Sequence, residues 1–186
     1  MYDASDSGLV GRAQGGDVDA IGTLYDQHHE SIFRYLWLRL GDRQVAEDLT
    51  GDVFVRMLTA LPNYRSVGLP FRAWLYRIAH NLLVDHFRKT NNPVLVPLDE
   101  INEQSDESDP ASATEQRLFV VRMNHALSRL DENQREVIVL RFVLGLPLRE
   151  VTLAMGKTEA AVKSLQHRGL VALRLVLSQE QEQVIR

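Results

Sequence analysis

Apolar residues recur with a period near 3.6 over the first ninety residues, as in amphipathic helices. The pattern predicts three helices: one from about Asp17 to Gly41, one that Asp42 caps and that ends before Pro62, and one from about Pro70 that ends before Pro93. The expected inward positions are Ile21, Leu24, Tyr25, His28, Ile32, Tyr35 and Leu36 in the first helix, Val45, Leu49, Val53, Met57 and Leu58 in the second, and Phe71, Trp74, Leu75, Ile78, Leu82 and Phe87 in the third. Three helices with short connections form a small all-α domain.

The same period returns in shorter pieces near the C-terminus. One helix is expected to carry Leu118, Val121, Leu127 and Leu130. The next opens at Asp131, with Gln134 as in a capping box, carries Val137, Ile138 and Phe142 on its stripe, and ends at Gly145. A short helix follows from Pro147 to Ala154, and then a tight turn over Met155-Gly156-Lys157. Thr158 is placed to cap a last helix with Ala161, Val162, Leu165, Leu170 and Leu173 on its stripe. Two helices joined by a short glycine-containing turn, the second one basic, are typical of a helix-turn-helix.

Charge separates these two helical parts. Residues 91–115 contain no Lys or Arg, seven Asp or Glu, and three prolines. Residues 116–186 contain eleven basic and seven acidic residues, a net charge of +4. The sequence therefore predicts an all-α protein in which a flexible acidic linker, residues 91–115, joins two small helical domains, residues 1–90 and residues 116–186, the second with the helix-turn-helix.

Composition excludes several classes of function. A net charge of −4 excludes a uniformly basic DNA-coating protein, so any DNA binding must rest on local charge. The absence of cysteine excludes disulfides, Cys-ligated zinc and thiol catalysis, and no cofactor or metal site is expected. No stretch approaches the roughly 18 apolar residues that a membrane span needs, so we expect no membrane insertion and a cytoplasmic location.

Two helices combine positive charge with chemistry suited to nucleic acid. The predicted last helix carries Lys163, Ser164, His167 and Arg168 at a spacing that places them on one face, as in a helix that enters the major groove. The alternative is a solvated face favoured by the helix dipole. The third predicted helix interleaves aromatic and basic residues, which suits single-stranded nucleic acid. Its expected exposed residues are Tyr76, Arg77, Asn81, Arg88 and Lys89, whereas Phe71, Trp74 and Phe87 are assigned to the core.

Two sets of residues resemble a known family. The runs Ala46 to Arg56 and Phe71 to Lys89 are similar to the second conserved region of extracytoplasmic-function (ECF) sigma factors, of the sigma-70 family. The run Leu130 to Val137, with Glu150-Val151, Thr158 to Ser164 and His167-Arg168, resembles their fourth region. The resemblance implies a dissociable initiation subunit of bacterial RNA polymerase that is not an enzyme. Gly51 and Gly169 depart from the family pattern, because other side chains are usual at both positions.

The resemblance also implies partners and sites. Core RNA polymerase would bind through the clamp helices of its largest subunit and the flap of its second-largest subunit, and an anti-sigma factor would regulate the chain. The implied residues are Asp48, Asp52, Phe54 and Arg56 for core polymerase, Asn63, Tyr64, Arg65, Tyr76, Arg77, Asn81, Arg88 and Lys89 for -10 promoter DNA, and Thr158, Lys163, Ser164, His167 and Arg168 for -35 promoter DNA. The loop from Leu61 to Leu69 matches the family loop that captures a flipped base. Phe54 and Tyr64 have an alternative role in the helical core.

Two other functions are weaker. One is a helix-turn-helix regulator that does not join polymerase, but this hypothesis leaves the runs Ala46 to Arg56 and Phe71 to Lys89 without a function. A helical metal hydrolase would need more than His28, His29 and Glu30, since adjacent histidines point to different helix faces.

Overall fold

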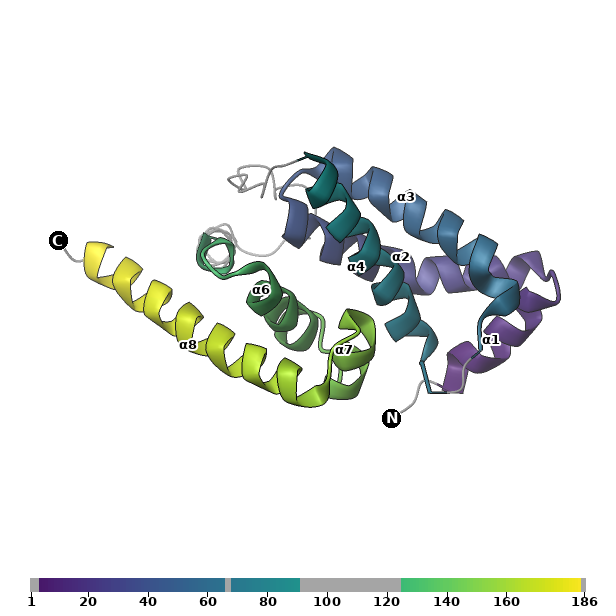
Figure 1. Ribbon diagram of the computed structural model, residues 1–186. Helices are drawn as coiled ribbons and strands as arrows, with labels where there is room; N and C mark the ends of the chain where they lie inside the picture. The colour runs from purple at the N-terminus through teal and green to yellow at the C-terminus, as the bar shows by residue number, and fades with distance from the viewer. Residues whose placement is uncertain (1–3, 66–67, 91–124, 185–186) are drawn as a thin grey trace, which may run out of the picture.

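The computed structural model describes residues 4–65, 68–90 and 125–184, and this part of the chain is helical without strands (Figure 1). The first half contains α1 (Ala4–Gln14), α2 (Val18–Leu40), α3 (Arg43–Ala60), the 3₁₀ turn η1 (Leu61–Asn63) and α4 (Phe71–Thr90). The second half contains α6 (Glu132–Ile138), the π-helical turn η2 (Val139–Val143), α7 (Leu148–Met155) and α8 (Glu159–Val184). The all-α prediction is confirmed.

Local side-chain chemistry sets the helix ends. Asp17 and Asp42 accept hydrogen bonds from the backbone N–H groups of Ala20, at 3.1 Å, and Val45, at 3.0 Å, and thereby cap α2 and α3. Gly41 ends α2 in the left-handed region, with φ of 72°. These ends agree with the sequence prediction. Helix α1 was not predicted, because its apolar residues are few: Val10 and Ala13 are its buried hydrophobic positions.

The second half also follows its predicted caps. Asp131 accepts from the Gln134 N–H at 2.9 Å, and Thr158 Oγ1 accepts from the Ala161 N–H at 3.3 Å. The backbone N–H of Leu144 donates to the carbonyl of Val139, five residues earlier, so the helix ends in a turn that is one residue wider than an α-turn. The N–H of Leu146 donates to the Leu140 carbonyl beyond this turn. The predicted linker, together with Leu118 and Val121, lies outside the described residues, and the domain boundaries stay predictions.

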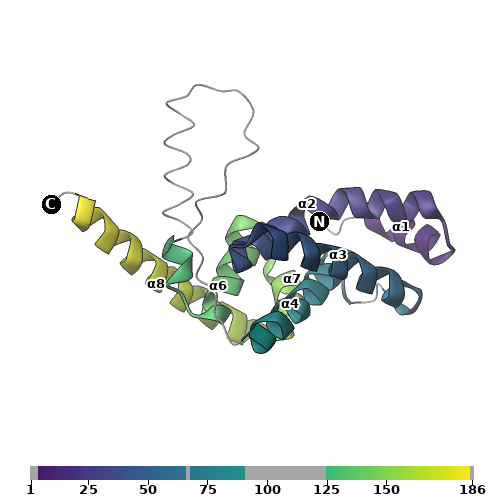
Figure 2. The ribbon, with the colours of Figure 1, turned by 90° about the horizontal axis from the view of Figure 1, so that it is seen from above.

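The two halves pack against each other. Helix α7 lies on α4 and η2 lies near α2, and one cluster of buried hydrophobic residues runs through both halves. Helix α8 packs on α6 and α7 and extends beyond them toward the C-terminus, away from α1 to α4 (Figures 1 and 2). Four inward predictions are wrong, since Tyr25, Leu58, Phe142 and Leu170 are 41%, 45%, 52% and 40% exposed. Each lies at the edge of its helix's apolar stripe, where no neighbouring helix covers it completely.

Candidate nucleic-acid interface

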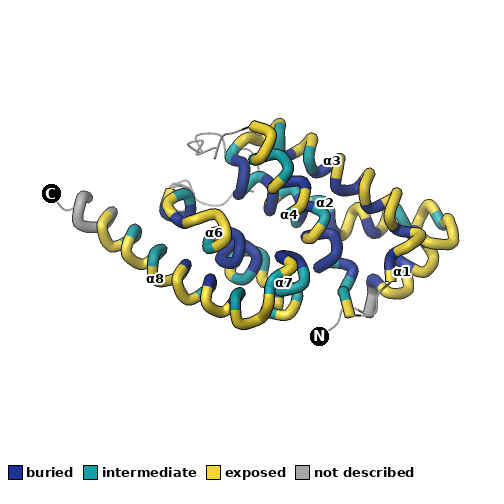
Figure 3. Tube along the Cα trace, in the orientation of Figure 1, coloured by how far each residue is buried: buried dark blue, intermediate teal, exposed yellow. Residues whose placement is uncertain are grey.

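The outer face of α8 presents the side chains that the sequence placed there. Lys163, Ser164, His167 and Arg168 are all exposed, whereas Val162 and Leu165 point into the core. Figure 3 shows this exposed strip along α8 on the side away from α6. Lys163 Nζ lies 2.6 Å from Glu159 Oε1, and this hydrogen bond lowers the pKa of the Glu159 carboxyl. Thr158 is also exposed, and its hydroxyl is engaged in capping the helix.

Interior contacts fix the orientation of α8. Gly156 takes the left-handed conformation, with φ of 61°, in the turn between α7 and α8. Arg141 donates from its NH1 group to the Leu146 carbonyl at 2.6 Å, and its Nε lies 3.5 Å from Gln166 Oε1 on α8. At Gly169 an added Cβ would lie 3.0 Å from Ile138 Cγ1, so the missing side chain permits close approach of α8 and α6. The basic face therefore stands on a tightly held helix-turn-helix.

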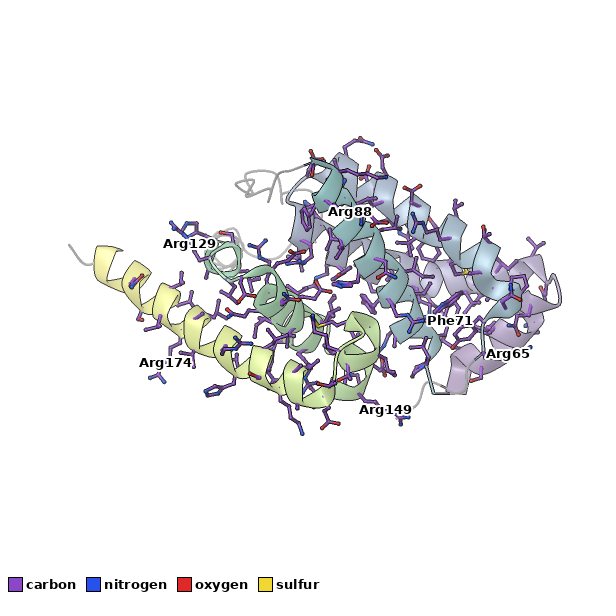
Figure 4. The ribbon with its side chains drawn as sticks, in the orientation of Figure 1. Arg65, Phe71, Arg88, Arg129, Arg149 and Arg174 are labelled. Carbon is purple, nitrogen blue, oxygen red and sulfur yellow. The ribbon has the colours of Figure 1, made fainter. Side chains whose placement is uncertain are left out.

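Helix α4 presents a second basic face. Arg77, Asn81, Arg88 and Lys89 are exposed, and Arg88 pairs with Asp85 at 3.0 Å. Asn63 and Arg65 are exposed in the segment that follows α3. Arg65 lies near the Phe71 end of α4, and Arg88 lies at the opposite end (Figure 4). The residues predicted for -10 DNA are therefore distributed along one 20-residue helix, roughly 30 Å long, and the loop at its start.

Two aromatic residues of this group are not on the surface. Tyr76 is 2% exposed and packs edge to face on Tyr35, with ring centroids 5.5 Å apart, so the expectation that it lies on the exposed face of α4 is wrong. It is covered by Tyr35 of α2, a contact that the sequence of α4 does not reveal. Tyr64 is 7% exposed, with its ring centroid 4.5 Å from that of Trp74 and its hydroxyl donating to the Leu69 carbonyl at 2.6 Å. Burial raises the pKa of Tyr64 to about 12, and its ring has the core role named as the alternative.

A third face lies on α3. Asp48, Asp52 and Arg56 recur at a spacing of four residues and are exposed in a row along the helix. Phe54 is 5% exposed and packs beside Tyr25, so it supports the face from within. The structure adds two residues that the sequence reading missed, Val55 and Leu58, which are 62% and 45% exposed. The sequence held one indication of this: Val55 is apolar although it lies outside the inward stripe of its helix.

A buried polar cluster joins the two halves. The Glu136 carboxylate on α6 accepts from Tyr35 Oη at 2.5 Å and lies 3.1 Å from His80 Nδ1 and 2.9 Å from Arg39 Nε. Burial by itself raises the pKa of Glu136, but the Arg39 charge and the hydrogen bonds from His80 and Tyr35 outweigh it, so the pKa lies below the ordinary 4.5. The Arg39 and Glu136 side chains are both 1% exposed. Their contact is a close charge pair without hydrogen-bond alignment, since Arg39 Nε has no hydrogen-bond partner among the described groups.

The described residues offer no group of three or more His, Cys, Asp or Glu side chains that could hold a metal ion. Within the same ranges, no helix has the length and apolar character needed to cross a bilayer.

Comparison with known proteins identifies both halves. Residues 24–92 match the model of sigma-70 region 2, and residues 126–175 match that of sigma-70 region 4. The chain is 38% identical over 170 residues to the ECF RNA polymerase sigma factor BldN of Streptomyces coelicolor. The matched region covers 91% of this chain and 64% of BldN. It is 36% identical over 180 residues to ShbA of Streptomyces griseus, covering 92% of this chain and 94% of ShbA, and 33% identical over 171 residues to SigD of Mycobacterium tuberculosis, covering 89% and 81%.

Solved structures agree on the fold. CnrH in complex with the cytosolic domain of CnrY matches 94% of this chain and 97% of that chain, with a TM-score of 0.71 and 26% identity. The sigma factor RpoE of Bartonella quintana, solved with the anti-sigma factor NepR, matches 84% of this chain and 96% of that chain, with a TM-score of 0.68 and 19% identity. The chain therefore belongs to the ECF subfamily of the sigma-70 family RNA polymerase sigma factors, which act in promoter recognition and transcription initiation and are not enzymes.

Proposed function

We propose that the three exposed faces divide the work of initiation among them. The face on α3, with Asp48, Asp52 and Arg56, binds the clamp helices of the largest polymerase subunit. The face on α8 reads the -35 element as duplex DNA. The α4 face and the loop before it hold the unpaired -10 strand.

The observation that carries this proposal is the outer face of α8. Lys163, Ser164, His167 and Arg168 are all exposed on it, and the helix itself is fixed by the contacts of Arg141 and the absence of a side chain at Gly169. Basic and hydrogen-bonding side chains on a rigid helix suit recognition of base edges and phosphates in the major groove. A helix-turn-helix regulator acting alone would use this face but would leave the α3 face without a partner.

The loop at Asn63 and Arg65 is the part of the -10 surface that the structure favours most. Both side chains are exposed, and the adjoining backbone is anchored through Tyr64. Opening a promoter costs a few kcal/mol of unpairing, which contacts to an extruded base offset. With the Tyr64 ring buried, we assign hydrogen bonding to Asn63 and phosphate pairing to Arg65, and we assign Tyr64 to holding the loop.

Regulation and location follow by analogy. CnrH was solved bound to the cytosolic domain of another protein, CnrY. We infer that this chain likewise binds a regulatory protein, an anti-sigma factor, and that it works in the cytoplasm, where core polymerase and promoter DNA are found.

Run-off transcription tests the whole proposal. The purified chain is mixed with core polymerase and a library of genomic fragments, and specific transcripts that require the chain support the function. The combined Asn63→Ala and Arg65→Ala variant should then reduce the permanganate reactivity of unpaired thymines while core binding stays near wild type. Absence of chain-dependent transcripts with an active core, or undiminished promoter opening by the folded variant, would contradict the corresponding part.

A further inference from the structure

The side chain of Gln14, at the end of α1, reaches across to the loop that follows α3. Its Nε2 donates to the Leu61 carbonyl at 2.9 Å and to the Tyr64 carbonyl at 2.8 Å. Both acceptors are carbonyl oxygens, so the NH₂ group of the amide must face them. One side chain thus connects the two ends of the turn formed by residues 61–64, from a helix about fifty residues earlier in the chain.

The same loop is held at a third point. Tyr64 Oη donates to the Leu69 carbonyl at 2.6 Å, and the Tyr64 ring packs on Trp74. The backbone is therefore tied at Leu61, Tyr64 and Leu69. Asn63 and Arg65, on either side of the tied Tyr64, remain exposed.

Helix α1 is itself firmly placed. Val10 and Ala13 are buried, and Arg12 pairs at 2.7 Å with Asp17, the residue that caps α2. Gly16 makes the turn between the helices with φ of 88°. Helix α1 precedes residues 24–92, the segment that matches sigma-70 region 2, so the family match does not itself point to Gln14.

We propose that Gln14 is a positioning residue for promoter opening, because it holds the loop in the conformation that presents Asn63 and Arg65 to the unpaired -10 strand. This inference rests on the proposed function of that loop. Without the two hydrogen bonds the loop also adopts conformations that do not bind the strand. The apparent affinity for the strand is then reduced in proportion to the fraction of molecules in the binding conformation. A loop that is mobile before binding also loses more conformational entropy when it binds the strand, which weakens binding further.

The test compares Gln14→Ala and Gln14→Glu with wild type. Glutamate keeps the shape of glutamine but cannot donate to a carbonyl, so both variants should lose the effect. Each variant is assembled with core polymerase, and binding of the non-template -10 oligonucleotide from a promoter mapped with the wild-type holoenzyme is measured by fluorescence anisotropy. We expect roughly tenfold weaker oligonucleotide binding in both variants, as for two lost hydrogen bonds, with unchanged affinity for core and for -35 duplex.

Controls separate the possible causes. Gln27→Ala, which truncates another exposed glutamine of the same half, should behave as wild type. If the combined Asn63→Ala and Arg65→Ala variant loses oligonucleotide binding while both Gln14 variants retain it, the positioning role is wrong and the function of the loop stands. If that combined variant also binds normally, the proposed loop function fails, and the inference fails with it. Equal losses in thermal stability, core binding and -35 binding for the Gln14 variants would show a purely structural role and overturn the inference.

Discussion

Replacement of Glu136 by glutamine should separate the two halves of the chain without unfolding either of them. The groups that contact its carboxylate, Tyr35, Arg39 and His80, lie on α2 and α4, although Glu136 itself belongs to α6. The substitution preserves the shape of the side chain and removes its charge. It therefore leaves Arg39, at 1% exposure, as a buried cation without its buried counter-ion, since the remaining carboxylate nearby, that of Glu132, is 55% exposed.

The structure sets the size of this effect. Removal of one partner from a buried ion pair costs about 3–5 kcal/mol when the other charge must stay buried. Here Arg39 can regain water if α6 and α7 move away from α2 and α4, so the loss cannot exceed the free energy that holds the halves together. That free energy includes the hydrophobic contact of α7 with α4 and the 3.0 Å pair of Arg72 with Glu150, which the substitution leaves in place. We expect a shift to open forms and little change in the unfolding of each half.

Fluorescence energy transfer measures the shift directly. The chain has no cysteine, so dyes on Thr59→Cys in α3 and Ser178→Cys in α8, both exposed, report the separation of the two halves. Transfer efficiency should fall in the Glu136→Gln variant. The matched control is Glu132→Gln on the same helix. Glu132 lies 3.7 Å from Arg39, but its own carboxylate is 55% exposed and screened by water, so its removal should cost less than about 1 kcal/mol. The reasoning is refuted if both variants keep wild-type transfer, or if helicity of the second half is lost in Glu136→Gln.

Three further predictions concern single positions. Gly51→Ala should stabilise the chain by about 0.5–1 kcal/mol, seen as a higher urea midpoint, because Gly51 lies mid-helix on α3 with open space around it. Gly169→Ala should destabilise it by about 1–3 kcal/mol, because the added Cβ would press on Ile138. A change of the same sign in both variants would contradict this packing. Asp52→Lys should weaken core binding in a pull-down while thermal stability changes little, with exposed Asp26→Lys as control, and unchanged core affinity would remove Asp52 from the polymerase face. Arg168→Ala should weaken binding to -35 duplex. If Arg168 reads a base, the preference at one base pair should fall by about 1–3 kcal/mol; if it contacts phosphate, binding to all sequences should weaken and the slope of log K against log salt concentration should fall by about one. Arg129→Ala, at another exposed arginine, is the control and should change neither quantity, and no change for Arg168→Ala would mean that the α8 face is merely solvated.

Helix ends were predictable because their causes are local. A cap needs a side chain within three residues of a free N–H group, and Asp17, Asp42 and Asp131 supply it from sequence positions that can be read directly. The exposed face of α8 was predictable for the same reason, because its apolar stripe assigns the opposite side to solvent. The π-helical exit at η2 was not, since it depends on how the chain closes onto α7.

Burial of polar residues was predicted poorly because it depends on the partner surface. Tyr76 on α4 packs on Tyr35 of α2, and Arg39 on α2 lies against Glu136 of α6, which is remote in sequence. One indication was present: Arg39 follows Tyr35 by four residues and so falls on an otherwise apolar stripe. A cation at such a position requires a buried counter-ion, and the acids of the second half were the candidates to consider.

The contact between the halves combines apolar packing with a buried ion pair. The three Arg39 guanidinium nitrogens are buried without a hydrogen-bond partner among the described groups, so the Arg39 and Glu136 attraction only partly offsets the cost of removing both charges from water. The apolar contact of α7 with α4 favours association, so the two contributions oppose each other. The α3 face and the α8 face stay exposed while the halves are together, whereas Arg72 on α4 is paired with Glu150 of the second half. The closed chain therefore leaves exposed the faces proposed for core polymerase and for -35 DNA, whereas Arg72, near the end of α4 that adjoins the proposed -10 loop, is released only when α7 leaves α4.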